Sequence, residues 1–99
     1  VYISSKMGSI GDNGGGGQYI YRSSKTALNA AVKSLSIDLA DAGFAATVIH
    51  PGWVQTDMGG PNALIDTKTS VSGMLQVIDS LNLDNAGQFY NYDGETIPW

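Results

Sequence analysis

The stretch Ala45-Ala46-Thr47-Val48-Ile49-His50, closed by Pro51-Gly52, decides the fold of this chain. It is a continuous, β-branched and largely apolar run, and such a run predicts a strand that is covered on both faces. Strands of this kind are typical of parallel sheets, where helices pack on the two faces. We therefore expect a buried parallel strand over residues 45–50, with Pro51-Gly52 as the turn after it.

The segment before this strand, residues 23–42, has the pattern of an amphipathic helix. Four apolar residues spaced by four, three and four positions share one face. They are Leu28, Val32, Leu35 and Leu39. Gly43 follows as a residue that ends a helix. The same helix carries small residues that suit close packing, either on the sheet or on a second copy of the chain. They are Ala27, Ala30, Ala31 and Ser34.

Further elements flank this helix and strand. Residues 1–5 and 88–92 have the composition of strands, and residues 6–18 that of a long loop. A second amphipathic helix is expected before the last strand, capped by Thr69 or Ser70. Its apolar face would consist of Val71, Met74, Leu75, Ile78 and Leu81. The order strand, helix, strand, helix, strand predicts an α/β fold with a parallel sheet and right-handed crossovers.

Two serines end the first strand, and a tyrosine and a lysine follow near the start of the first helix. Tyr21 and Lys25 are four positions apart, so both side chains would project from one helix face. A cation about 4 Å from a phenol in a partly dry site contributes on the order of 4 kcal/mol, or roughly three pKa units below the ordinary value near ~10. The pair therefore predicts a tyrosine that acts as a general acid or base near neutral pH.

Three motifs, taken in order, resemble the second half of a short-chain dehydrogenase/reductase. They are the strand ending in Ser4-Ser5, the pair Tyr21-x-x-x-Lys25 and the turn Pro51-Gly52-x-Val54-x-Thr56. Residues 87–94 and Ile97-Pro98-Trp99 are similar to the carbonyl-reductase or C-factor-like branch. The resemblance spans nearly the whole chain. It implies the C-terminal part of a doubly wound Rossmann fold, in which residues 1–99 form the catalytic half. The N-terminal dinucleotide-binding half would be absent here and present in a longer parent protein.

The resemblance also implies a role for each catalytic residue. Tyr21 would give a proton to a carbonyl oxygen, or take one from an alcohol, while a hydride passes to or from NAD or NADP. Lys25 would hold the nicotinamide ribose and lower the pKa of the phenol. Ser5 would donate a hydrogen bond to the substrate oxygen and stabilise the charge that develops there.

The turn after the buried strand would hold the cofactor. By the resemblance, Pro51 and Gly52 shape this turn, the backbone around Val54 contacts the nicotinamide carboxamide, and Thr56 contacts the pyrophosphate. Such a position, at the carboxyl end of a parallel strand, is where ligands of open α/β sheets bind. The choice between NAD and NADP depends on residues of the missing half.

Ser9 competes with Ser5 for the role of the catalytic serine. Ser9 stands twelve residues before Tyr21 and Ser5 sixteen before it, and the shorter spacing is nearer to the usual one of the family. We favour Ser5 because loops between a strand and a helix tolerate insertions, and residues 14–17, four consecutive glycines, have that character. Ser4 should face the opposite way along the strand.

Composition excludes several other classes of function. A net charge of −4 with only five basic residues argues against nucleic acid and against an anionic membrane surface. The absence of cysteine excludes a disulfide framework and a thiolate metal site, and it fits a cytoplasmic protein. The single histidine, His50, cannot hold a metal cluster, and we expect it to be a satisfied residue at a strand end with no catalytic role.

The sequence thus predicts an NAD(P)-dependent carbonyl reductase or alcohol dehydrogenase that acts on a small molecule. By the resemblance, the parent protein would be a dimer or tetramer, and the isolated chain would have little activity. Two alternatives stay open. One is a non-catalytic regulatory or structural protein of the same fold. The other is a nucleotide-sugar epimerase of the extended branch, which uses the same tyrosine and lysine but carries a larger C-terminal substrate domain.

Overall fold

The computed structural model describes residues 1–99. Its sheet has three strands in the order β1-β2-β3, namely β1 (Tyr2–Ile3), β2 (Val48–His50) and β3 (Phe89–Asn91). The helices are α1 (Tyr19–Asp38) and α2 (Thr67–Ser80), and two short 3-10 helices, η1 (Lys6–Gly8) and η2 (Ala40–Ala42), accompany them. Both strand pairs are parallel. The predicted order of elements and the parallel α/β sheet are therefore confirmed.

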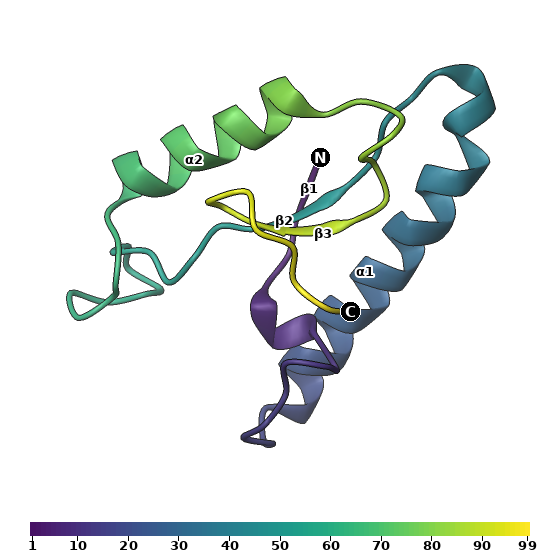
Figure 1. Ribbon diagram of the computed structural model, residues 1–99. Coiled ribbons are helices and arrows are strands. Elements are labelled where there is room, and N and C mark those ends of the chain that lie inside the picture. The colour runs from purple at the N-terminus through teal and green to yellow at the C-terminus, as the bar shows by residue number, and fades with distance from the viewer.

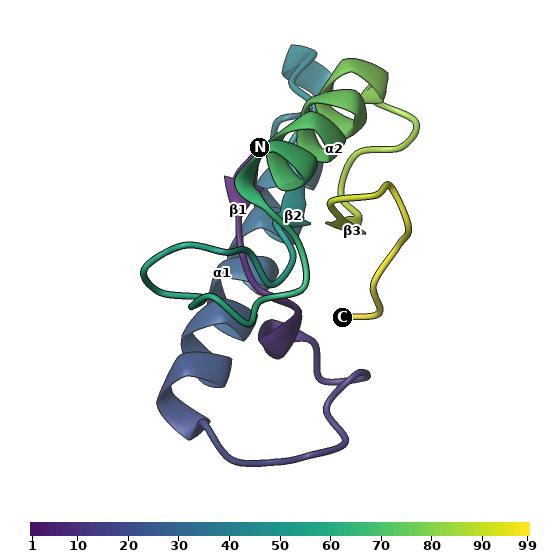
Figure 2. The same cartoon turned by 90° about the vertical axis from the view of Figure 1, so that its left-hand side faces the viewer.

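The two long helices cover opposite faces of the sheet (Figures 1 and 2). On one face, Val32 of α1 packs with Val48 and Phe89 in the main core. On the other face, Gly73 of α2 lies so near that a Cβ there would be 2.4 Å from the Tyr92 carbonyl oxygen. The sheet is therefore doubly wound.

This arrangement corrects the expected handedness of the crossovers. The strand order steps twice in the same direction, from β1 to β2 and from β2 to β3. With α1 and α2 on opposite faces, the two crossovers must have opposite hands, so they cannot both be right-handed (Figure 2). The long segment 51–66 between β2 and α2 gives the chain enough length to reach the second face.

The burial of β2 agrees with its apolar sequence. Val48 and Ile49 are completely buried between β1 and β3. By contrast, β1 pairs with β2 only and forms an edge of the sheet, where Tyr2 and Ile3 are 42% and 53% exposed. The central strand thus has its two neighbours within the chain, and β1 has one free edge.

Helix α1 begins four residues earlier than its pattern predicts. The hydroxyls of Ser23 and Ser24 donate to the carbonyl oxygens of Ile20 and Tyr21, at 3.1 Å and 2.8 Å. These serines therefore lie inside the first turns, where a hydroxyl can bond back to the preceding turn. The preceding residue, Gln18, adopts the left-handed conformation with φ of 52° and makes no side-chain cap. Because of this earlier start, Tyr21 lies within the helix, where it is one helical turn from Lys25.

Helix α2 also begins earlier than predicted, and Thr69 and Ser70 are not its cap. The Asp66 carboxylate caps it by accepting a hydrogen bond from the Thr69 backbone N–H at 2.7 Å. The expected apolar face is not buried within this chain either, because Val71 and Leu75 are 49% and 54% exposed. Val77 is the buried apolar residue of α2. Neither α1 nor α2 has the length and hydropathy that a membrane-spanning helix needs.

Candidate active site

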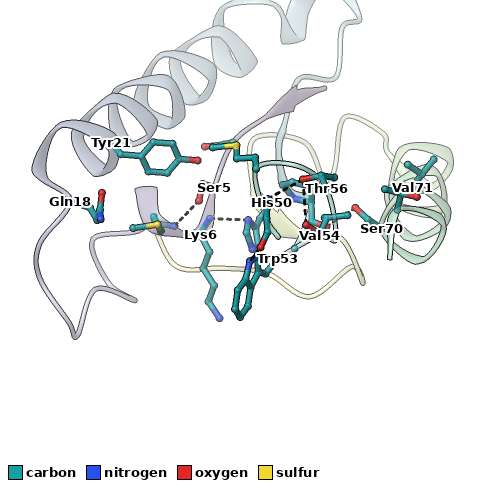
Figure 3. Close-up of a pocket in the computed structure, with 17 residues that line it drawn as sticks. Ser5, Lys6, Gln18, Tyr21, His50, Trp53, Val54, Thr56, Ser70 and Val71 are labelled. Atoms are coloured by element: carbon teal, nitrogen blue, oxygen red, sulfur yellow. Dashed lines mark hydrogen bonds between the residues drawn. The ribbon is translucent and has the colours of Figure 1, made fainter. Parts of the chain in front are cut away.

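A cleft of about 860 Å³ opens where β1 and β2 end (Figure 3). Ser5 follows β1, Tyr21 lies in the first turn of α1, and the turn after β2 forms the opposite wall. Pro51, Gly52, Val54 and Thr56 all line this cleft. Its volume is that of a small-molecule site, and its position at the carboxyl ends of parallel strands is where open α/β sheets bind ligands.

Ser5 is held in the cleft by the short helix that follows it. It caps η1, and its side-chain oxygen accepts a hydrogen bond from the Met7 backbone N–H at 3.1 Å. Because the oxygen acts as the acceptor in this bond, the hydroxyl proton stays available to a ligand. Figure 3 shows the Tyr21 hydroxyl directed into the cleft on the side of Ser5. Both residues therefore line one cleft although they are sixteen positions apart in sequence.

Lys25 lies beside Tyr21, one turn further along α1. Its ammonium nitrogen is 5.7 Å from the centroid of the Tyr21 ring, which is cation–π distance. The side chain is partly buried and lies behind the ring, outside the residues that line the cleft. The predicted shared face of Tyr21 and Lys25 is therefore present in the structure. Tyr19 is 84% exposed and lies away from the cleft.

The other two serines are occupied by structural hydrogen bonds. The buried Ser9 hydroxyl donates to the Pro98 carbonyl oxygen and accepts from the Asp12 backbone N–H. Ser9 does not line the cleft. Ser4 lines it, but its hydroxyl donates to the Asn29 side-chain oxygen at 2.6 Å. Of the three candidates, Ser5 alone both lines the cleft and keeps its hydroxyl proton free.

The turn after β2 is fixed at both of its ends. At its start, the Ser70 hydroxyl of α2 donates to the Pro51 carbonyl oxygen at 2.6 Å. Gly52 has φ of 91°, and a Cβ there would come within 2.6 Å of the Ile65 side chain. Further along, Val54 forms a parallel bridge with Ile65. Glycine suits position 52 because its positive φ is a conformation that other residues rarely adopt, and a Cβ there would also require the Ile65 side chain to move.

Residues 53–60 form a tight loop at the mouth of the cleft. The Thr56 side-chain oxygen accepts a hydrogen bond from the Gly59 backbone N–H at 3.1 Å. The Trp53 indole N–H donates to the Gly59 carbonyl oxygen at 2.9 Å. These bonds fold the loop back on itself and leave the Met58 side chain 86% exposed. The loop thus presents one hydroxyl and two large side chains to the cleft region.

His50 lines the cleft, although the sequence predicted only a satisfied residue at a strand end with no catalytic role. Its Nδ1 accepts a hydrogen bond from the Lys6 backbone N–H at 3.0 Å. Burial and, next, the positive charge of Lys6 hold the pKa of the imidazole below its ordinary value of 6.5, while Asp12 opposes them. The ion pair between Lys6 and Asp12 has a separation of 3.8 Å and both side chains are about half exposed, so it contributes little stability.

Comparison with protein families gives one clear match. A family model described as short chain dehydrogenase matches residues 1–64. Among curated relatives, C-signal of Myxococcus xanthus is 53% identical over 99 residues, and the match covers 100% of this chain and 60% of that protein.

Solved structures show the same relationship. The carbonyl reductase Sniffer of Drosophila melanogaster superimposes with a TM-score of 0.94 and 49% identity, over 98% of this chain and 39% of that one. The NADPH-bound carbonyl reductase from chicken fatty liver superimposes with a TM-score of 0.89 and 38% identity, over 98% of this chain and 41% of that one. The chain thus spans less than two thirds of the length of each of these proteins.

Proposed function

Because this chain belongs to the short-chain dehydrogenase family, we propose that it forms the catalytic half of an NAD(P)-dependent carbonyl reductase or alcohol dehydrogenase. The substrate is a small carbonyl compound or the corresponding alcohol. The name and the bound NADPH of the chicken carbonyl reductase support this proposal, as does the name of the Drosophila protein. The chain itself contributes the proton-transfer and substrate-binding groups.

One observation carries the proposal: Ser5 and Tyr21 meet in one cleft, and Lys25 stands behind the Tyr21 ring. A hydrogen-bond donor and a phenol on the same side of a cleft suit a carbonyl oxygen that gains charge and then a proton. Lys25 places a cation beside this phenol, with its ammonium nitrogen 5.7 Å from the centroid of the Tyr21 ring.

The residues of the cleft fit a nicotinamide cofactor. Gly52, Val54 and Thr56 of the turn after β2 line the cavity, and the Thr56 side chain brings a hydroxyl to it. Lys25 would reach the ribose from its place beside Tyr21. When bound, the nicotinamide supplies or accepts the hydride. Ser5 would orient the substrate oxygen by donating a hydrogen bond, and Tyr21 would donate the proton that this oxygen takes up.

We infer that residues 1–99 belong to a parent protein with an N-terminal half of the kind that the relatives have. The relatives extend well beyond the matched part, and β1 presents a free edge with exposed Tyr2 and Ile3. The small residues on α1 are exposed and suit an interface with a second copy in a dimer or tetramer. They are Ala27, Ala30, Ala31 and Ser34.

Two measurements test this proposal. The parent protein should oxidise NADPH or NADH in the presence of small aldehydes or ketones, and the oxidation should depend on the carbonyl compound. The 99-residue chain should bind either cofactor only weakly in isothermal titration, because most dinucleotide contacts lie in the other half. Micromolar binding by the isolated chain would contradict the half-domain proposal, and a parent protein without carbonyl-dependent oxidation would contradict the reductase.

The similarity to C-signal favours one second candidate, a signalling protein of the same fold. A protein with a purely signalling role would act through its surface, by binding a partner, and would not need the proton-transfer groups of the cleft. The Tyr21→Phe substitution separates the two proposals, because it removes one hydroxyl and preserves the ring. If the Tyr21→Phe variant of the parent protein keeps its full biological effect, that effect does not need the phenol, and this would favour signalling. If the effect is lost with the hydroxyl, this would favour the enzyme.

A further inference from the structure

The end of β2 is joined to the turn after Ser5 by one side chain. The Nδ1 atom of His50 accepts the Lys6 backbone N–H at 3.0 Å, across 44 positions of sequence. A neutral imidazole that accepts at Nδ1 carries its proton on Nε2. The bond therefore fixes both the ring orientation and its tautomer.

This bond completes the capping of η1. The first backbone N–H groups of a helical turn have no partner within the turn. In η1, the Met7 N–H is taken by the Ser5 side-chain oxygen and the Lys6 N–H by His50. Ser5 immediately precedes Lys6 and lies two positions before Met7. Losing the His50 acceptor would remove the protein partner of the Lys6 N–H and free the backbone next to Ser5 to shift.

The surroundings of His50 keep this acceptor available at neutral pH. The titratable groups that face it are Lys6 of η1, Asp12 of the following loop and Tyr21 of α1 across the cleft. Burial and the Lys6 charge favour the neutral ring, and Asp12 opposes them. An imidazolium has a proton on both nitrogens and accepts no hydrogen bond, so acid removes the contact to Lys6.

We propose that His50 is a positioning residue that holds the Lys6 amide, and through it keeps the Ser5 hydroxyl aimed at the substrate oxygen. The proposal rests on the reductase function proposed above. It assigns to His50 no contact with the reacting atoms. The expected cost of its loss is a defect in turnover rather than in cofactor binding.

Two polar substitutions in the parent protein test the role. In His50→Asn, an amide oxygen can take the place of Nδ1 and accept the Lys6 N–H without titrating. In His50→Gln, the amide lies near the place of Nε2 and misses that N–H. We expect His50→Gln to lower kcat about tenfold, the loss of one well-placed hydrogen bond, with the Kd for NADPH little changed. His50→Asn should keep kcat near that of the unsubstituted protein.

The pH profile supplies a second readout. The unsubstituted protein should lose kcat as the pH falls through the pKa of His50 in the folded protein, which lies below the ordinary value of 6.5. His50→Asn should lack that decline. Equal kcat values for the Gln variant and the unsubstituted protein, or equal defects in the Asn and Gln variants, would overturn the positioning role.

Nitrogen-15 spectra of the histidine ring test the contact without any activity. His50 is the single histidine of these 99 residues, and the His50→Asn variant identifies its signals. We expect an unprotonated Nδ1 and a Lys6 amide signal that titrates together with the ring. A proton on Nδ1 would overturn the proposal. An intact contact in a protein without carbonyl-dependent NADPH oxidation would instead overturn the reductase function, so the two failures are distinguishable.

Discussion

Gly8 of η1 lies directly against Lys25 of α1. A Cβ at Gly8 would come within 2.8 Å of the Lys25 Cβ and within 2.9 Å of its backbone carbonyl carbon. The Thr26 hydroxyl also donates to the Gly8 carbonyl oxygen at 2.8 Å. The turn that carries Ser5 thus packs on the turn of α1 that carries Tyr21 and Lys25. This contact is what brings the three side chains of the proposed catalytic set together.

A methyl group at Gly8 should therefore separate these two turns. We expect Gly8→Ala to lower the free energy of unfolding by about 1–3 kcal/mol, because the helix backbone at Lys25 cannot give way. The same substitution should lower kcat of the parent protein. Urea unfolding and steady-state kinetics measure the two effects. Gly15→Ala is the matched control, since a Cβ at Gly15 meets no atom within 4 Å. Equal behaviour of the two variants would contradict the packing argument.

Ser5 and Ser9 should respond to substitution in opposite ways. Ser5→Ala removes the proposed donor to the substrate oxygen, and we expect kcat to fall roughly 10²-fold with a modest loss of stability. Ser9→Ala leaves the Asp12 N–H and the Pro98 carbonyl oxygen without their partner. We expect it to lower the free energy of unfolding by about 1–3 kcal/mol and to leave kcat of the folded protein nearly unchanged. A larger loss of kcat in Ser9→Ala than in Ser5→Ala would reverse the assignment.

The stability of the fold should decline on the acid side because of His50. Its pKa in the folded state lies below the ordinary value of 6.5, so the unfolded chain binds a proton first as the pH falls. The stabilisation is complete above 6.5 and is lost as the pH falls from there through the lower pKa of the folded protein. Unfolding curves at several pH values measure the decline. It should be smaller in His50→Asn, and an identical decline in that variant would assign it to other groups.

The cap of α2 gives a prediction that concerns the fold alone. Hydrogen bonding by Thr69, through its side chain first and its backbone second, holds the pKa of Asp66 below its ordinary value of 3.8. We expect Asp66→Ala to lower the midpoint of thermal unfolding, since the first turn loses its acceptor. Circular dichroism measures this midpoint. The stabilisation is present above pH 3.8 and is lost as the pH falls below it. Asp57→Ala, at an exposed loop position without a cap, should have no comparable effect.

Local patterns predicted the parts of the fold that depend on local chemistry. The apolar run that ends at His50 predicted the buried strand β2, because a strand covered on both faces must be apolar on both. The spacing of Tyr21 and Lys25 predicted their shared face, because helical geometry fixes it. The caps were predicted less well. Ser23 and Thr69 looked like starts of helices, and the structure instead begins α1 at Tyr19 and caps α2 with Asp66.

Contacts between distant segments were beyond the reach of those patterns. The bond from Lys6 to His50 joins residues 44 positions apart, and the bond from Ser70 to Pro51 joins residues 19 apart. Neither leaves a local signal, since a histidine after a strand and a serine in a helix are compatible with many surroundings. The free hydroxyl proton of Ser5 likewise depends on η1. The sequence did not predict this short helix, because it lies in a segment, residues 6–18, that was expected to be a loop.

The most direct test of the account is hydride transfer in the parent protein with Tyr21→Phe. Stopped-flow measurement of NADPH oxidation by a small aldehyde gives the rate, and fluorescence titration gives the Kd for NADPH. We predict a rate at least about 10²-fold lower, since the proton donor is gone, and a nearly unchanged Kd. Tyr19→Phe, at a position outside the cleft, should match the unsubstituted protein. A Tyr21→Phe protein that reduces the aldehyde at the unsubstituted rate would contradict the central claim.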